Sequence, residues 1–117
     1  MKSLIKKILR EGDFDWIREH EPSQEEILKY IKDNNITEWR FKNHWEGDLN
    51  LEGTPITNLG NLESVGGDLY LIGTPITNLG NLKSVGGDLY LEGTPMSKNY
   101  SEKEIRKMVR VNGVVYL

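Results

Sequence analysis

The sequence predicts an α+β fold in which about four parallel strands stack as a short solenoid. Two observations lead to this prediction. Residues 45–96 repeat with a period of 20, and they read WEGDLNLEGTPITNLGNLES, VGGDLYLIGTPITNLGNLKS and VGGDLYLEGTPM. A unit this short cannot bury its own leucines, whereas stacked units share one core. We therefore expect residues 1–44 to form an N-terminal helical cap with an edge strand, and residues 45–117 to form the repeats with a C-terminal helix and strand.

Each repeat begins with a strand that has one buried face. In GDLYL, Leu69 and Leu71 alternate with Asp68 and Tyr70, which is the period of a half-buried strand. A Gly-Thr-Pro turn follows, since proline lacks an N–H and does not suit a central strand. The Gly-Gly pair before each Asp allows a sharp bend where a Cβ would clash. The equivalent strands are expected at 48–52, 68–72, 88–92 and 114–117.

The segment before the repeats is predicted to be mostly helical. Residues 4–9 place their apolar side chains on one helical face, and a second short helix is expected around Trp16. This amphipathic pair packs on the open end of the stack, or it docks on a partner or a membrane surface. The capping-box pattern at residues 23–26 predicts a helix through about Asp33. Residues 36–42 alternate around two aromatic residues and are predicted to form a strand.

The C-terminal segment contains a fourth repeat in altered form. Residues 111–117 (VNGVVYL) match residues 85–91 (VGGDLYL), but at a spacing of 26 instead of 20. The additional residues include a second capping box at 101–104. An apolar stripe of Ile105, Met108 and Val109 follows it. A helix is therefore expected to replace the last return segment and to cover the end of the core.

The spacing of the apolar residues from Leu62 to Leu82, LxxVxxxLxLxxTxIxxLxxL, resembles a short leucine-rich repeat. The GGDLYL element also looks like the repeats of receptor L-domains. The resemblance implies a right-handed solenoid, and it implies little about activity. One additional residue before Leu69, and Thr74 in place of the usual asparagine, leave a right-handed β-helix-like coil as the alternative cross-section. Repeats of the form GGDLYLEGTPIT are also similar to uncharacterised repeat proteins of bacteria and their phages.

Composition limits the classes of function. The chain has 117 residues, no cysteine and a formal charge of −3. The lack of cysteine excludes disulfides and favours a cytoplasmic location. The acidic balance argues against nucleic-acid binding, although the basic residues of 2–10 and of the C-terminal segment keep it as a third alternative. No apolar stretch approaches the roughly 20 residues that a membrane span needs.

The outward strand positions form the candidate site. They align as a column of aspartates, a column of tyrosines and a third column of mixed type. Exposed tyrosines favour binding, although ordinary strand propensity also explains them. The aspartates either hold a divalent cation or, as we favour, accept backbone N–H bonds at the Gly-Gly bend. The predicted partner-binding residues are Asp68, Tyr70, Ile72, Asp88, Tyr90, Glu92 and Tyr116.

No catalytic constellation appears in the sequence. The two histidines, His20 and His44, lie outside the repeat without metal-ligand spacing, and no phosphate-binding loop is present. We therefore expect a non-enzymatic protein-binding module without metal or cofactor. The phage-like repeats suggest an inhibitor, encoded by a phage, of a host or defence protein. The alternative is a structural or assembly protein that docks through its N-terminal amphipathic helix.

Overall fold

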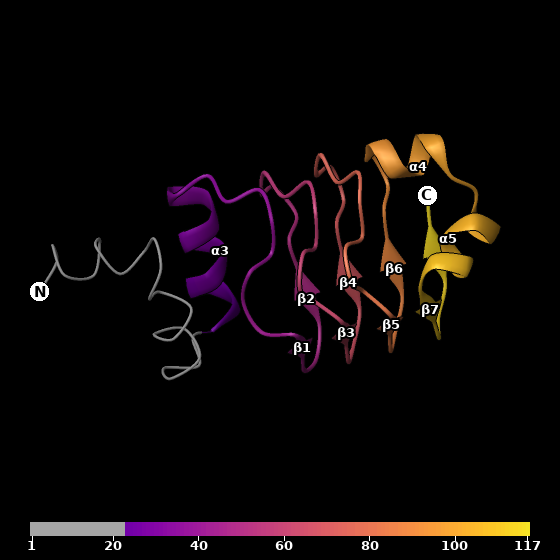
Figure 1. Ribbon diagram of the computed structural model, residues 1–117, viewed down its shortest axis with the longest axis horizontal. Helices are drawn as coiled ribbons and strands as arrows, with labels where there is room; N and C mark the ends of the chain where they lie inside the picture. The colour runs from indigo at the N-terminus through magenta and orange to yellow at the C-terminus, as the bar shows by residue number, and fades with distance from the viewer. Residues whose placement is uncertain (1–22) are drawn as a thin grey trace, which may run out of the picture.

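The computed structural model describes residues 23–117, and the two helices predicted for residues 4–17 lie outside this range. The described chain is α+β, with its helices at the two ends and short strands between them (Figure 1). The helices are α3 (Gln24–Asp33), α4 (Pro95–Asn99) and α5 (Glu102–Met108). The strands are β1 (His44–Trp45), β2 (Leu49–Asn50), β3 (Ser64–Val65), β4 (Leu69–Tyr70), β5 (Ser84–Val85), β6 (Leu89–Tyr90), β7 (Arg110–Val111) and β8 (Val115–Tyr116).

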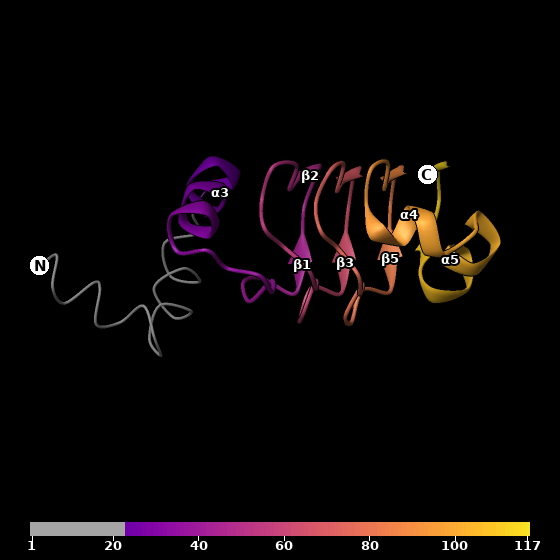
Figure 2. The same ribbon diagram turned by 90° about the horizontal axis from the view of Figure 1, so that it is seen from above.

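The strands form two parallel sheets of four strands each. Their orders are β1-β3-β5-β7 and β2-β4-β6-β8, so each sheet takes one strand from every repeat. Figures 1 and 2 show the two sheets as separate strips along the stack. Leu49 pairs with Leu69, and Leu69 pairs with Leu89, which preserves the 20-residue register. The prediction that the GDLYL segments are successive parallel strands is confirmed, although each strand has only two residues.

The sheet of β1, β3, β5 and β7 was not predicted. Its members are pairs such as Ser64–Val65, of which only the valine is buried. A two-residue strand has no alternation to detect, because the period-2 pattern needs at least four residues. The Gly-Thr-Pro turn explains why the strands of the other sheet are also short. Gly53, Gly73 and Gly93 have φ values of 82°, 72° and 74°, which only glycine adopts readily.

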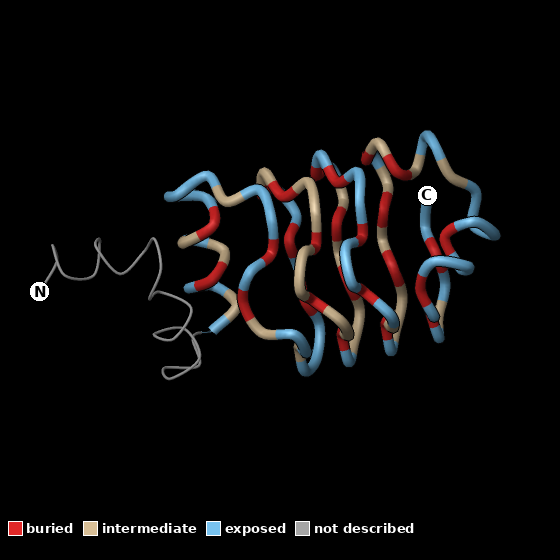
Figure 3. The backbone as a smooth tube through the Cα atoms, in the orientation of Figure 1, coloured by how far each residue is buried: buried red, intermediate tan, exposed pale blue. Residues whose placement is uncertain are grey.

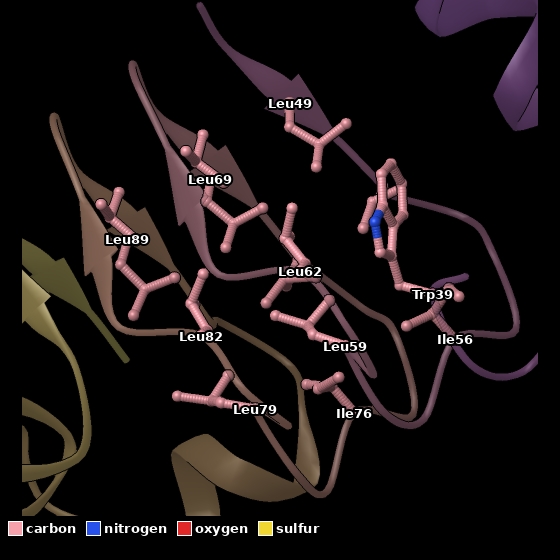
Figure 4. Packing of buried hydrophobic residues seen from close by; sticks show 14 of the residues in the cluster. Trp39, Leu49, Ile56, Leu59, Leu62, Leu69, Ile76, Leu79, Leu82 and Leu89 are labelled. Atoms are coloured by element: carbon pink, nitrogen blue, oxygen red, sulfur yellow. The ribbon is translucent and has the colours of Figure 1, made fainter. Parts of the chain in front are cut away.

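The leucines of successive repeats lie above one another and form the core. Figure 3 shows buried segments at matching places in each repeat, and Figure 4 shows the leucine side chains of successive layers pointing into one shared core. Both strand leucines of the first three repeats are fully buried, as expected, whereas Leu117 of the last repeat is 43% exposed. Three buried threonines, at 54, 74 and 94, each donate a hydroxyl hydrogen bond to the carbonyl three residues earlier, at 2.6–2.8 Å. This bond satisfies a polar side chain inside the core.

The N-terminal end of the core is covered by aromatic residues and by α3. Ser23 and Glu26 form the predicted capping box, and α3 buries Ile27 and Ile31. Trp39 is fully buried and makes edge-to-face contacts with Phe41 and Trp45. The prediction of a strand at 36–42 is wrong, since only Glu38 pairs, as an isolated parallel bridge to Asn58. The alternation of apolar and polar residues at 36–42 arises because Trp39 and Phe41 are buried, and their burial does not require a strand.

The C-terminal repeat keeps its register despite its six additional residues. Val85 pairs with Val111, and Tyr90 pairs with Tyr116. The predicted helix is α5, with its capping box from Ser101 and Glu104. The additional residues also form α4, which was not predicted; it begins at Pro95 after the N-cap Thr94.

The apolar stripe predicted for the C-terminal helix is only partly buried. Ile105 and Val109 are buried as expected, whereas Met108 is 43% exposed and does not belong to the stripe. No helix within residues 23–117 is long and apolar enough to cross a membrane. The division of the chain at residues 44 and 45 stays a prediction.

Leu71→Ala tests the stacked core. Leu71 is fully buried in the central repeat, so we expect its truncation to lower the free energy of unfolding by about 2–5 kcal/mol. Ile72→Ala, at the adjacent half-exposed position, is the matched control and should cost less than about 1 kcal/mol. Urea denaturation of both variants measures the difference. Equal losses would contradict the assignment of Leu71 to the core.

Candidate protein-interaction face

All seven predicted site residues lie along one sheet, at positions that alternate with the buried leucines. We call this surface the Tyr face and define it as the outward positions of the sheet β2-β4-β6-β8. Its three columns contain aspartates, tyrosines and residues of mixed type, and all of these side chains are exposed or half-buried. The columns are Asp48, Asp68, Asp88 and Val114; Asn50, Tyr70, Tyr90 and Tyr116; and Glu52, Ile72 and Glu92.

The three tyrosine rings form a continuous stack. The ring centroids of Tyr70 and Tyr90 are 4.5 Å apart, and those of Tyr90 and Tyr116 are 4.6 Å apart. The interplanar angles are 10° and 8°, so the rings are nearly parallel. Both ring faces of Tyr90 are therefore covered by neighbours. The stack therefore presents the ring edges and hydroxyl groups of Tyr70 and Tyr90 outward, on rings that restrict each other's rotation.

Each aspartate links one repeat to the next. Oδ1 of Asp48 accepts a hydrogen bond from the backbone N–H of Asp68 at 2.8 Å. The same bond recurs at 2.8 Å from the N–H of Asp88 to Asp68, and from the N–H of Val114 to Asp88. This outcome agrees with the favoured interpretation of the aspartates as N–H acceptors. The sequence did not reveal that each donor belongs to the following repeat.

The second oxygen of two aspartates holds the tyrosine of the same repeat. The hydroxyl of Tyr70 donates to Oδ2 of Asp68 at 3.2 Å, and the hydroxyl of Tyr90 donates to Oδ2 of Asp88 at 3.5 Å. Both oxygens of Asp68 and Asp88 thus have partners within the fold. These two residues therefore contribute to the structure of the Tyr face as well as to its charge.

The repeated Gly-Gly-Asp motif has a steric explanation. A Cβ atom on Gly67, Gly87 or Gly113 would overlap with Oδ1 of the aspartate in the preceding repeat. The second glycine of each pair therefore leaves space for the carboxylate that binds the adjacent N–H. This requirement also explains why Gly113 remains in the last repeat, where the first glycine is replaced by Asn112.

The Tyr face is acidic. Five carboxylates occupy its columns, and no lysine or arginine stands at any of the defined positions. The pKa of Tyr90 is raised to about 12. Burial is the largest cause, followed by the neighbouring Tyr70 and Asp88. Burial also raises the pKa of Tyr70, with the hydrogen bond to Asp68 as the next cause. The hydroxyls of Tyr70 and Tyr90 therefore stay protonated at neutral pH, as their hydrogen bonds to Asp68 and Asp88 require.

No group of three histidine, aspartate or glutamate side chains in 23–117 is arranged to hold a metal ion. His44 lies on the other sheet, where Nδ1 is hydrogen-bonded to the hydroxyl of Ser64. The arrangement on the Tyr face can bind a partner through ring edges, hydroxyls and carboxylates. Comparison with protein-family models, curated proteins and solved structures finds no match for the chain.

Gly87→Ala tests the contact between glycine and aspartate. The added Cβ would overlap with Oδ1 of Asp68, so we expect a loss of about 1–3 kcal/mol in unfolding free energy. In an Asp68→Ala background the overlap with Oδ1 is gone and only the 3.1 Å contact with the carbonyl carbon of Gly67 remains, so the same substitution should cost measurably less. A double-mutant cycle from urea denaturation gives the coupling energy. Fully additive losses would show that the two residues do not constrain each other.

Alkaline titration tests the environment of the tyrosines. The ordinary pKa is 10.0, and that of Tyr90 in the folded protein is about 12. A raised pKa contributes stability below the unfolded value, so stability should fall as pH rises from about 10 to about 12. Absorbance at 295 nm and urea midpoints measure both effects, and Tyr90→Phe should reduce the decline. Ionisation of every tyrosine near pH 10 would contradict this prediction.

Proposed function

We propose that this chain is a non-enzymatic protein-binding module that uses the Tyr face to hold a basic surface of a protein partner. The observation that carries the proposal is the row of stacked tyrosines bordered by carboxylates. We further propose that the repeats form a right-handed, leucine-rich-repeat-like solenoid. The shared 20-residue register and the parallel strand order support this interpretation. The absence of cysteine favours action in the cytoplasm.

The stacked rings favour binding because little conformational entropy remains to be lost. Tyrosine contributes a large contact area with only two side-chain torsions, and hot spots at interfaces are enriched in it. On this face the rings already restrict each other, and Asp68 and Asp88 orient two of the hydroxyls. The cost of ordering side chains on association is therefore reduced. Ile72, half-exposed beside Tyr70, adds apolar contact at the centre.

The charge of the face favours a basic partner. Within residues 23–117, no basic side chain forms an ion pair with the carboxylates of Asp48, Glu52 or Glu92. Complementary charge on a partner accelerates association and suppresses unsuitable partners. The resemblance of the repeat motif to repeats of bacterial and phage proteins is our reason for proposing a host or defence protein as the target that this module inhibits. Occupation of a basic cleft by the acidic face would be the inhibitory event.

Affinity capture with matched variants tests the proposed function. The full chain and Tyr70→Ala/Tyr90→Ala are immobilised, and captured host proteins are quantified by mass spectrometry. A partner of the Tyr face should bind the variant about 2 kcal/mol or more weakly, the scale of interface hot spots. Its affinity for the full chain should also fall with added salt. Thermal unfolding of the variant shows how much stability the broken stack removes.

Two controls separate this function from docking through the N-terminal segment. Glu63→Ala/Lys83→Ala removes an exposed ion pair with a separation of 3.8 Å, and these residues adjoin the other sheet. That variant should bind as the full chain does. Deletion of residues 1–17 should also preserve binding. Loss of the partner upon this deletion, with full binding by the tyrosine variant, would replace the proposal by the assembly function.

A further inference from the structure

Strand β8 is an end of the sheet that carries the Tyr face. Among residues 23–117, the order β2-β4-β6-β8 leaves one side of β8 without a neighbouring strand. The carbonyls of Val114 and Tyr116 accept the N–H groups of Leu89 and Leu91 from the β6 segment, at 2.9 and 2.8 Å. Because successive residues of a strand direct their backbone groups to opposite sides, those of Val115 and Leu117 face outward. An open strand edge of this kind favours pairing with another strand.

The corresponding strands at two other sheet ends are capped by side chains. At β2, Gln24 imitates a neighbouring strand: its amide nitrogen donates to the carbonyl of Asp48 at 2.9 Å, and its oxygen accepts the N–H of Asn50 at 2.7 Å. At β7, Arg106 donates to the carbonyls of Val111 and Gly113 at 2.9 and 2.8 Å. Within residues 23–117, no side chain caps β8 in this way. The lack of a cap is therefore specific to this edge of the Tyr face.

The exposed apolar residues gather at the same end of the stack. The large hydrophobic side chains of the described chain that are exposed are Met108, Val114, Tyr116 and Leu117. Three of the four belong to β8 or flank it. Val114 stands where the earlier repeats have an aspartate, so the aspartate column ends before this edge. A strand that pairs with β8 consequently meets apolar groups and no carboxylate of that column.

The tyrosine stack makes the edge complementary to itself. Its centroid spacing of 4.5–4.6 Å is close to the 4.7–4.9 Å between neighbouring strands, and the outer face of Tyr116 has no ring against it in residues 23–117. A second copy related by a two-fold axis pairs antiparallel. With Val115 opposite Leu117 of the second copy, the two outward segments exchange backbone hydrogen bonds. The same register places Tyr116 directly opposite Tyr116 and prolongs the stack.

We propose that β8 is a self-association edge, at which two copies of this chain pair β8 to β8 about a two-fold axis at Tyr116. The paired sheets form one sheet of eight strands with six stacked tyrosines. The contact is small compared with the 1,200–2,000 Å² of a stable interface, so the association is weak and depends on concentration. The proposal does not depend on the function of the Tyr face, because Tyr70 and Tyr90 remain exposed to a partner in the dimer.

Sedimentation equilibrium of the full chain tests the proposal. Between about 10 μM and 1 mM protein, the average mass should rise from 13.4 kDa toward twice this value. Tyr116→Lys places like charges opposite each other at the axis and should weaken association at least tenfold. Leu117→Pro removes an outward N–H and should have a similar effect. Met108→Lys, an equal charge change at a 43% exposed site on α5, is the control and should associate normally.

Hydrogen exchange identifies the contact. Protection of the Val115 and Leu117 amides should increase with protein concentration in the full chain and not in Tyr116→Lys. A full chain that stays monomeric at 1 mM overturns the proposal. Association that survives both Tyr116→Lys and Leu117→Pro, or that Met108→Lys abolishes equally, overturns it as well. Protection of the two amides by a different protein, with no association of the chain itself, would assign the edge to that protein.

Discussion

Backbone pairing between equivalent residues of adjacent repeats is the constraint on which the structure depends. Each layer must present its N–H and C=O groups where the next layer has its partners, so every layer must follow the same outline. The identical turn glycines, the buried threonines and the stacked leucines are local solutions to this single requirement. The Asp-to-N–H bond between repeats belongs to the same set, because it satisfies the N–H group that precedes β4, β6 and β8.

The fold was predictable where the sequence has a period. The strands of the β2-β4-β6-β8 sheet, their parallel order and the register of the last repeat followed from the 20-residue repeat and the GDLYL alternation. The other sheet was missed because a Ser–Val pair has no period of its own. Residues 36–42 were misjudged because burial of Trp39 and Phe41 gives the same alternation as a strand. Periodicity reports which side chains face the core, and it does not report which backbone groups pair.

The positions of the candidate site residues on one face were predictable from the sequence, whereas the contacts among them were not. All seven named residues lie on one face, since outward strand positions align in any parallel stack with constant register. Their mutual contacts depend on rotamers and distances that a sequence pattern does not contain. Asp68 thus serves two repeats, with Oδ1 on the next backbone and Oδ2 on Tyr70. The caps formed by Gln24 and Arg106 gave no signal in the sequence, because each acts on backbone groups distant from its own helix turn.

The two complete repeats have a consequence for how this chain can vary. The segments 54–62 and 74–82 are identical in sequence, and each layer offers the same lower and upper surface to its neighbours. If one copy were inserted or removed, the repeats that then become neighbours would find the same leucine, aspartate and glycine contacts that they make now. Gain or loss of one 20-residue repeat would therefore change the length of the tyrosine row in whole steps. The length of the Tyr face depends on the number of repeats, whereas the residue types on it stay the same.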